Sequence, residues 1–258
     1  MSVQNNTPTL VLEGMTSISA LIRSIESGKS NRQILEIRYD ISKATKKRRE
    51  LDFLKRKAAE LQFSLLPSSA DDICALTNGN TNGGIVALCT PRSFPELDLD
   101  AILPEGFYVL IDGIEDPYNF GYILRSLYAA GADGVVLPPR NWMNASSVVA
   151  RASAGTSELF DVFVSDTEEC FRLFREKGYR IVCAGIRDSV SLFEADLKMP
   201  LLLVVGGEKR GISAKLLGQC DDIVRIDYAR EFKGSLTAAT ATAIMAFEIM
   251  RQNPRSLS

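Results

Sequence analysis

Asn119 and Arg125 stand six residues apart in DPYNFGYILRSLYAAGADGVVL, residues 116–137, at the start of an amphipathic helical pattern. A guanidinium donates several hydrogen bonds in one plane, which suits phosphate binding, and an asparagine amide both donates and accepts. Six residues of helix turn about 600°, so these side chains lie about 120° apart and could border one cleft. Spacing alone favours the simpler interpretation of an asparagine near the helix N-terminus and a solvated arginine.

A second polar segment, GGEKRG at residues 206–211, follows the apolar run LLLVV. Glycines let the backbone approach a ligand closely and adopt positive φ. The segment lacks the glycine spacing of a dinucleotide-binding turn and the Gly-Lys-Ser/Thr of a phosphate-binding loop. By itself it indicates either a ligand loop or a plain turn.

A third candidate segment, IDYAREFKGSLTAATATAIMAFEIMRQ at residues 226–252, has a polar loop before Ser235 and then predicts a long helix from Ser235 to about Gln252. The small residues at its start permit close packing, and the later positions are mostly apolar. We therefore expect most of this helix to lie in the core, whatever the protein does.

The composition removes several kinds of chemistry. The 258-residue chain has a net charge of −2 and no histidine, which excludes imidazole metal ligands, serine–histidine triads and the usual general base. Five cysteines, with no C-x-x-C pair, predict buried reduced thiols in a cytoplasmic protein and no zinc site. No apolar run reaches the roughly 20 residues that span a bilayer, and the first ten residues do not read as a signal peptide.

The elements that would position these segments form a strand-then-helix repeat after about residue 105. The predicted strands are FYVLIDGI, GVVLPP, DVFVS, YRIVCAGI, PLLLVVGGE and DIVRIDY. Several are apolar throughout, which is typical of a parallel sheet covered on both faces. Such α/β sheets bind ligands at the carboxyl ends of their strands, where the three candidate segments follow.

The first hundred residues alternate helix and strand patterns and predict a small α/β sandwich of their own. A stretch with Pro91, Pro95 and Pro104 separates the two parts. We place a first domain at 1–95, a linker at 96–104 and a second domain at 105–258. The predicted helix KATKKRRELDFLKRK, from Lys43 to Lys57, has eight basic and two acidic residues, which fits either a solvated face or a phosphate-binding surface.

The order of the three segments resembles the three motifs of the SpoU (TrmH-type) RNA ribose methyltransferases of the SPOUT superfamily. The resemblance covers about residues 105–252 and includes VVARASAGTSELF between the first two motifs. It implies an enzyme that uses S-adenosylmethionine to methylate a ribose 2′-hydroxyl in ribosomal or transfer RNA. It also implies a parallel sheet with a deep trefoil knot, a homodimer formed through the second domain, and a first domain that binds the RNA substrate.

The resemblance assigns eight positions to the site and no metal. It places cofactor contacts at Gly206, Ile226 and Leu236, and catalytic positions at Asn119, Arg125, Glu208, Ser235 and Thr237. Because an arginine pKa lies above about 12, Arg125 is a poor proton acceptor. We therefore expect Arg125 to clamp the neighbouring phosphate and orient the hydroxyl.

The sequence departs from the family pattern at several positions. Thr237 stands where the third motif usually has asparagine, and Asp227 stands where it usually has proline. The loop to Ser235 is one residue longer, and Asn82 replaces the usual histidine of the first domain. Two alternatives therefore stay open: a catalytically silent RNA-binding relative, and an unknotted α/β nucleotide-binding enzyme.

Overall fold

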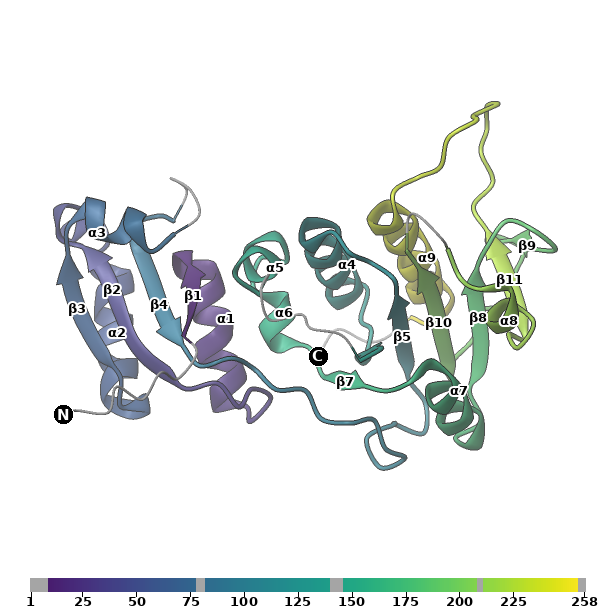
Figure 1. Ribbon diagram of the computed structural model, residues 1–258, viewed down its shortest axis with the longest axis horizontal. Helices are drawn as coiled ribbons and strands as arrows, with labels where there is room; N and C mark the ends of the chain where they lie inside the picture. The colour runs from purple at the N-terminus through teal and green to yellow at the C-terminus, as the bar shows by residue number, and fades with distance from the viewer. Residues whose placement is uncertain (1–8, 78–81, 140–145, 208–210, 255–258) are drawn as a thin grey trace. The chain divides into compact units, whose positions relative to one another are not determined.

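The chain forms two compact units, each built around its own sheet (Figure 1). The computed structural model describes residues 9–77, 82–139, 146–207 and 211–254. Of these, residues 9–93 and 146–159 belong to the first unit, and residues 94–139 and 160–254 belong to the second.

The first unit has a four-stranded sheet in the order β1-β4-β2-β3. Strands β1 and β2 both run antiparallel to β4, and β3 runs parallel to β2. Its elements are β1 (Leu10–Glu13), α1 (Gly14–Glu26), β2 (Ile34–Asp40), a 3₁₀ turn η1 (Ile41–Lys43), α2 (Arg48–Leu61), β3 (Ser64–Ser68), α3 (Ala70–Ala75), β4 (Ile85–Cys89), α5 (Ser146–Ala152) and α6 (Thr156–Leu159). The strand β1 is absent from the sequence-based prediction.

A buried ion pair ties the segment 146–159 into the first unit. The guanidinium of Arg32 donates from Nε and Nη2 to the two carboxylate oxygens of Glu158, at 2.9 and 3.3 Å, and from Nη1 to the carbonyl of Thr90 at 2.9 Å. Both charged side chains are almost completely buried. Because an unpaired charge would be costly at this depth, the pair holds α6 beside the strands. This segment lies inside the range predicted for the second domain, so the compact unit and that predicted boundary differ.

The second unit has a seven-stranded sheet in the order β7-β6-β5-β10-β8-β11-β9, and every neighbouring pair is parallel. The predicted α/β class with a parallel sheet is therefore confirmed. Its elements are β5 (Phe107–Asp112), α4 (Pro117–Ala129), β6 (Gly134–Leu137), β7 (Val162–Val164), α7 (Thr167–Glu176), β8 (Arg180–Ala184), β9 (Val190–Ser191), β10 (Leu201–Gly206), α8 (Ala214–Leu217), β11 (Asp222–Arg225) and α9 (Ala238–Gln252).

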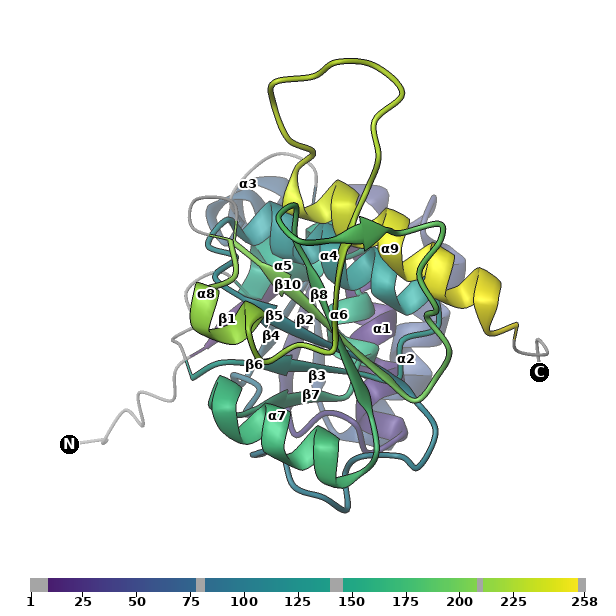
Figure 2. The same cartoon turned by 90° about the vertical axis from the view of Figure 1, so that its right-hand side faces the viewer.

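Helices cover both faces of this sheet. Figure 2 shows α7 on one face, with α4 and α9 on the other. Leu202 and Val204 of β10 share a core with Phe171 and Phe174 of α7. The uninterrupted apolar runs of β5 and β10 thus reflect burial on two sides. None of the described helices is long and apolar enough to cross a bilayer.

The stretch predicted as a linker, residues 96–104, packs into the second unit instead. Leu97 and Ile102 are buried in the same core as α7, and Leu97 N–H donates to the carbonyl of Val164 at 2.9 Å. The prolines suggested an open connection, but the apolar residues between them are anchored to the sheet edge.

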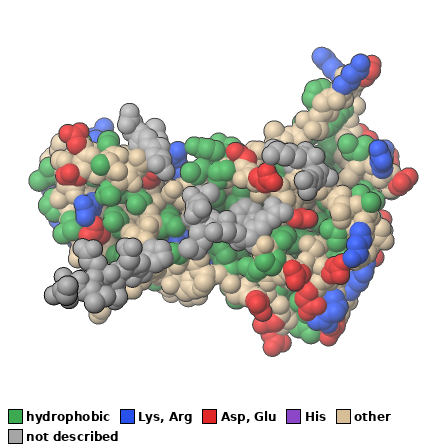
Figure 3. Space-filling view, viewed as in Figure 1, with side chains coloured by type: hydrophobic (Ala, Val, Ile, Leu, Met, Phe, Trp, Pro, Cys, Tyr) green, Lys and Arg blue, Asp and Glu red, His purple; other side chains and the backbone are tan. Residues whose placement is uncertain are grey.

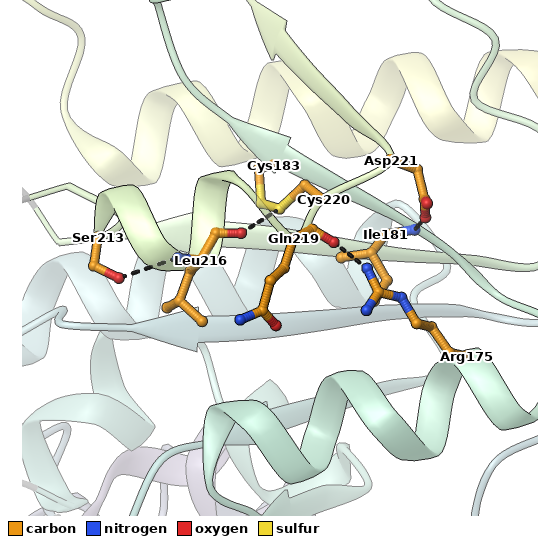
Figure 4. The surroundings of a disulfide bond; sticks show 8 residues. All are labelled: Arg175, Ile181, Cys183, Ser213, Leu216, Gln219, Cys220 and Asp221. Carbon is orange, nitrogen blue, oxygen red and sulfur yellow. Dashed lines mark hydrogen bonds between the residues drawn. A yellow bond between two sulfur atoms is a disulfide. The ribbon is translucent and has the colours of Figure 1, made fainter.

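The cysteines differ from the prediction of five buried reduced thiols. Cys89 and Cys170 are buried free thiols, whereas Cys74 is exposed. Cys183, on β8, forms a disulfide with Cys220, in the turn that follows α8 (Figure 4). The two cysteines are 37 residues apart in the sequence, and no local pattern predicts their pairing. They meet because the turn after α8 folds back onto β8.

Two hydrogen bonds beside the disulfide hold the same turn against the sheet (Figure 4). The Asp221 carboxylate accepts from Ile181 N–H at 2.7 Å, and Arg175 of α7 donates to the carbonyl of Gln219. The turn is therefore fixed on both sides of Cys220. This places β11 next to β8, with its carboxyl end at the same edge as that of β10.

Candidate active site

The three candidate segments leave the second unit at one edge of its sheet. Because β5, β10, β8 and β11 are parallel, their carboxyl ends lie on the same side. The register pairs Gly206, the last residue of β10, with Asp112, the last residue of β5. The first and second segments thus begin beside each other. This agrees with the expectation that the candidate segments follow the carboxyl ends of the strands, where α/β sheets bind their ligands.

Glycines allow the backbones of these two loops to touch. A Cβ on Gly207 would lie 2.1 Å from the carbonyl oxygen of Gly113, which itself has a φ of +81°. A Cβ on Gly206 would lie 2.6 Å from the carbonyl carbon of Gly211. No side chain fits at these distances, so Gly206 and Gly207 of the second segment are required by close backbone approach. The plain-turn interpretation does not account for this crowding.

A cavity of about 100 Å³ lies between this edge and the start of α9. Small or apolar residues from β8, β10, the second loop and α9 surround it. They are Ala184, Val205, Gly206, Gly211, Ile212, Ala238, Ala241, Thr242 and Met245. Of these, only Gly206 was predicted as a site residue. The signal that could have found others is the run of small residues at the start of the last helix, which opens space as well as permitting close packing.

Helix α4 carries the predicted pair from the first segment. Asp116 caps the helix by accepting a hydrogen bond from Asn119 N–H at 2.8 Å, and Pro117 occupies the first turn. Asn119 is half-buried and Arg125 is exposed. Arg125 makes no hydrogen bond or ion pair with any residue in the described part of the chain.

The third segment reaches the cavity through the first turns of α9. β11 ends at Arg225, and Ile226 follows it half-buried at the carboxyl edge. After an exposed loop, Leu236 N–H donates to the hydroxyl of Tyr228 at 3.2 Å. Helix α9 then packs against α4. The loop therefore returns the chain to the helix pair that carries the first segment.

The last helix begins three residues later than predicted. Ser235 is exposed and precedes the helix, while Thr237 is its N-cap. The Thr237 hydroxyl accepts from Thr240 N–H at 3.2 Å and lies 3.0 Å from the Thr240 hydroxyl. Thr237 was predicted as a catalytic position; in the structure its hydroxyl is engaged in capping α9.

The carboxylate of Asp227 is held in place beside the strand end. Arg225 Nε lies 2.8 Å from its Oδ1. A hydrogen bond from Ser191, with a further contribution from Arg225, lowers the pKa of Asp227 below its ordinary value. Asp227 is therefore ionised at neutral pH and fixes the chain where it enters the loop.

Glu208, the remaining predicted catalytic position, lies outside the described residues. Gly206, Ala238 and the helix start after Thr237 are brought to one cavity, and α4 with Arg125 packs beside α9. Within the described ranges, no group of three or more His, Cys, Asp or Glu side chains is arranged to hold a metal ion.

Comparison with known proteins gives a consistent family. The sequence model of the SpoU rRNA Methylase family matches residues 106–247. A Shewanella oneidensis protein, 23S rRNA (guanosine-2′-O-)-methyltransferase RlmB, is 31% identical over 202 residues, covering 76% of this chain and 82% of the relative. A protein of the same name from a Burkholderia species is 28% identical over 251 residues, covering 96% and 98%.

Solved structures agree with the sequence matches. An rRNA methyltransferase from Sinorhizobium meliloti has a TM-score of 0.78 and 26% identity, over 99% of this chain and 90% of that one. Its AdoMet-bound structure matches equally well. The similarity thus extends over both units of the fold.

Proposed function

This chain belongs to the SpoU rRNA Methylase family, and we propose that it is an S-adenosylmethionine-dependent RNA methyltransferase acting on a ribose 2′-hydroxyl of ribosomal or transfer RNA. The names of its relatives and the AdoMet-bound structural neighbour support the reaction and the cofactor. The observation that carries the proposal is the meeting of the second and third segments around one cavity at the carboxyl edge of the sheet, with α4 of the first segment packed against α9.

The cavity suits part of this cofactor. Its walls are mostly apolar, and two glycines, Gly206 and Gly211, contribute backbone to its lining. Such a surface can receive a flat heterocycle and recognise it through the backbone. We assign the cofactor contacts to the backbone at Gly206, Ile226 and Leu236. When bound, S-adenosylmethionine supplies an electrophilic methyl group on its sulfonium.

We include the deep trefoil knot in the proposal. Strand β10 lies between β5 and β8, both of which precede it in the chain, and β11 then adds beyond β8. The chain must therefore return into an existing sheet before the loop at residues 226–237 leads to α9. This insertion is compatible with threading of the last segment, and an experimental structure of the chain would test it.

The chain's own residues would orient the RNA. Arg125 is exposed and has no partner among the described residues, so it can clamp the phosphate next to the target ribose with two parallel hydrogen bonds. Asn119 and Ser235 can hydrogen-bond the ribose, and Glu208 is assigned to hold Arg125. Thr237 acts indirectly, because its cap fixes the start of α9 beside the cofactor cavity. The proton of the hydroxyl would leave through the phosphate or solvent.

The first unit offers a phosphate-binding stripe on α2 and the turn before it. Most cations of residues 43–57 are paired: Lys47 with Glu50, Arg48 and Lys55 with Asp52, Lys57 with Glu26 and Glu60, and Lys43 with Asp40. Lys46, Arg49 and Arg56 are exposed and form no ion pair with any described residue. Arg49 and Arg56 lie seven residues apart, on one helical face. We propose that these three cations contact the RNA backbone.

A homodimer completes the proposal. Helices α4 and α9 pack together and leave Tyr118, Tyr122, Phe247 and Met250 exposed. Tyr118, Tyr122 and Arg125 follow at intervals of four and three residues, so the exposed apolar face borders the catalytic arginine. A second copy covering this face would place the site near the interface. A monomer in sedimentation of the full chain at micromolar concentration would contradict this assignment.

The proposed reaction is tested by mass-spectrometric mapping of ribose methylation in total RNA from cells with and without the protein. A methyl-transfer assay with the purified protein follows. Arg125→Ala should abolish methyl transfer while calorimetry shows cofactor binding like that of the wild type. Arg172→Ala is the matched control, because Arg172 is an exposed arginine on α7, on the opposite face of the sheet. Substantial turnover by Arg125→Ala would remove Arg125 from the mechanism, and a wild type that binds no cofactor would indicate a silent relative.

A further inference from the structure

The loop between β11 and α9 presents an aromatic side chain to solvent. Residues 227–235 are all exposed, and the loop extends away from the sheet of its unit (Figures 1 and 2). At its tip Phe232 is 56% exposed, a large apolar surface for a side chain in a polar loop. Single exposed apolar side chains are common on protein surfaces, so the surroundings of this ring decide whether it has a binding role.

Contacts within the loop hold this ring in place. The rings of Phe232 and Tyr228 meet at 5.6 Å between centroids with planes 60° apart. The Tyr228 hydroxyl accepts from Leu236 N–H, which fastens the loop to the start of α9. On the other side a Cβ at Gly234 would lie 2.6 Å from Phe232 Cζ, so the ring packs over the glycine backbone. Phe232 is thus pre-positioned with part of its surface free.

Two cations stand on either side of Phe232 in the sequence. Arg230 and Lys233 are exposed, and neither forms a hydrogen bond or an ion pair with another residue that the structure describes. Glu231 lies between them, so the tip carries a net charge of +1 from two cations and one anion. Figure 3 shows basic and acidic side chains gathered at the tip of this loop. An aromatic platform with cations on either side matches the chemistry of a nucleotide, which has a flat base and an anionic backbone.

We propose that Phe232 stacks on an unpaired base of the RNA substrate while Arg230 and Lys233 contact the adjoining phosphates. The proposal rests on the methyltransferase function above and concerns how its substrate is held. Stacking needs a free base face, so the loop selects single-stranded or bulged RNA over a continuous duplex. Because Ser235 follows Phe232 by three residues, a base bound at the tip would lie within a few nucleotides of the target ribose.

The test measures binding of the full chain to a fluorescently labelled, unstructured 20-nucleotide RNA and to the same strand in a duplex. Phe232→Ala should raise the Kd for the single strand by about 5- to 150-fold, the range for losing one base–aromatic stack. The duplex Kd should change by less than about twofold. Phe232→Tyr, which keeps a ring, should stay near the wild type.

Phe193→Ala is the matched control, because Phe193 is 59% exposed elsewhere in the same unit. It should leave both Kd values unchanged. The double variant Arg230→Gln/Lys233→Gln should reduce the slope of log K against log salt by about 1.4, since each phosphate contact on a single strand contributes about 0.7.

Different results would overturn the stacking proposal and the methyltransferase function on which it rests. A wild type without cofactor binding or methyl transfer would overturn the function. Single-strand binding by Phe232→Ala at wild-type strength, or an equal loss with Phe232→Tyr, would overturn the stacking role alone. Weakened cofactor affinity in Phe232→Ala, measured by calorimetry, would show that the ring serves the cofactor instead. Thermal melts of each variant establish that it is folded.

Discussion

Replacing Thr237 with alanine removes the hydroxyl that caps α9. In the structure this oxygen accepts from Thr240 N–H at 3.2 Å and lies 3.0 Å from the Thr240 hydroxyl. The helix it caps is 15 residues long, and its first turn lines the cofactor cavity through Ala238 and Ala241. Without the cap, the first turn loses a partner for one of its free N–H groups and frays.

The size of the effect follows from the exposure of Thr237. Because the side chain is exposed, its loss leaves no cavity, and the cap alone determines the cost. Threonine-to-alanine changes at N-caps cost about 1 kcal/mol, within a range of about 0.5–2. For a unit of this size, that lowers the melting temperature by about 2–4 °C. Thr237→Asn should be neutral or slightly stabilising, because asparagine caps at least as well as threonine.

Differential scanning calorimetry of the variants measures the change in melting temperature, and methyl transfer is assayed in parallel. Thr240→Ala is the control, because it keeps the N–H that Thr237 binds and removes only the second hydroxyl. If capping is the role of Thr237, activity falls in Thr237→Ala and returns in Thr237→Asn. An unchanged melting temperature in Thr237→Ala, or an equal loss in the asparagine variant, would refute the capping argument.

The other two predictions concern the cofactor loop and the basic helix. Gly206→Ala should raise the Kd for the cofactor by about tenfold or more, a loss of about 1.4 kcal/mol in binding free energy, as measured by calorimetry. The reason is that the added Cβ would lie 2.6 Å from the backbone across the loop. Gly218→Ala, whose Cβ would meet nothing closer than 3.5 Å, is its control, and equal affinities in both would contradict the close-approach argument. The double variant Arg49→Gln/Arg56→Gln should reduce the slope of log K for RNA binding against log salt by about 1.4–1.8. Lys57→Gln should change this slope little, because Lys57 is already paired with Glu26 and Glu60. If the double variant and the wild type have equal slopes, α2 is only a solvated face.

The parallel sheet was predictable because its central strands have a distinctive composition. β5 and β10 are buried along almost their whole length, and strands covered on both faces read as continuous apolar runs. The strand β1 was missed because four residues carry too little periodicity, and only pairing with β4 defines it. The disulfide was missed because its two residues meet through the fold of α8 and its following turn.

The start of α9 shows the limit of local signals. Ser235 and Thr237 are both N-cap residue types, so the sequence alone allows the helix to begin after either. The structure uses Thr237, whose hydroxyl accepts from Thr240 N–H, while Leu236 N–H donates to the Tyr228 hydroxyl from across the loop. The cavity was equally hidden, since Ala184, Ile212 and Met245 come from three separate elements. Such features depend on tertiary packing, which no single segment contains.

The two departures in the third motif bear on whether the chain is active. Proline usually fixes the backbone after the strand; here Asp227 is held by Ser191 and Arg225, which restrain the same point through hydrogen bonds and charge. Asparagine usually stands at the position of Thr237, and both residues cap a helix through a side-chain oxygen. Each substitution therefore replaces one means of fixing the backbone with another. In this chain the Thr237 hydroxyl caps α9 and the Asp227 carboxylate pairs with Arg225, so both positions still restrain the backbone of the third motif.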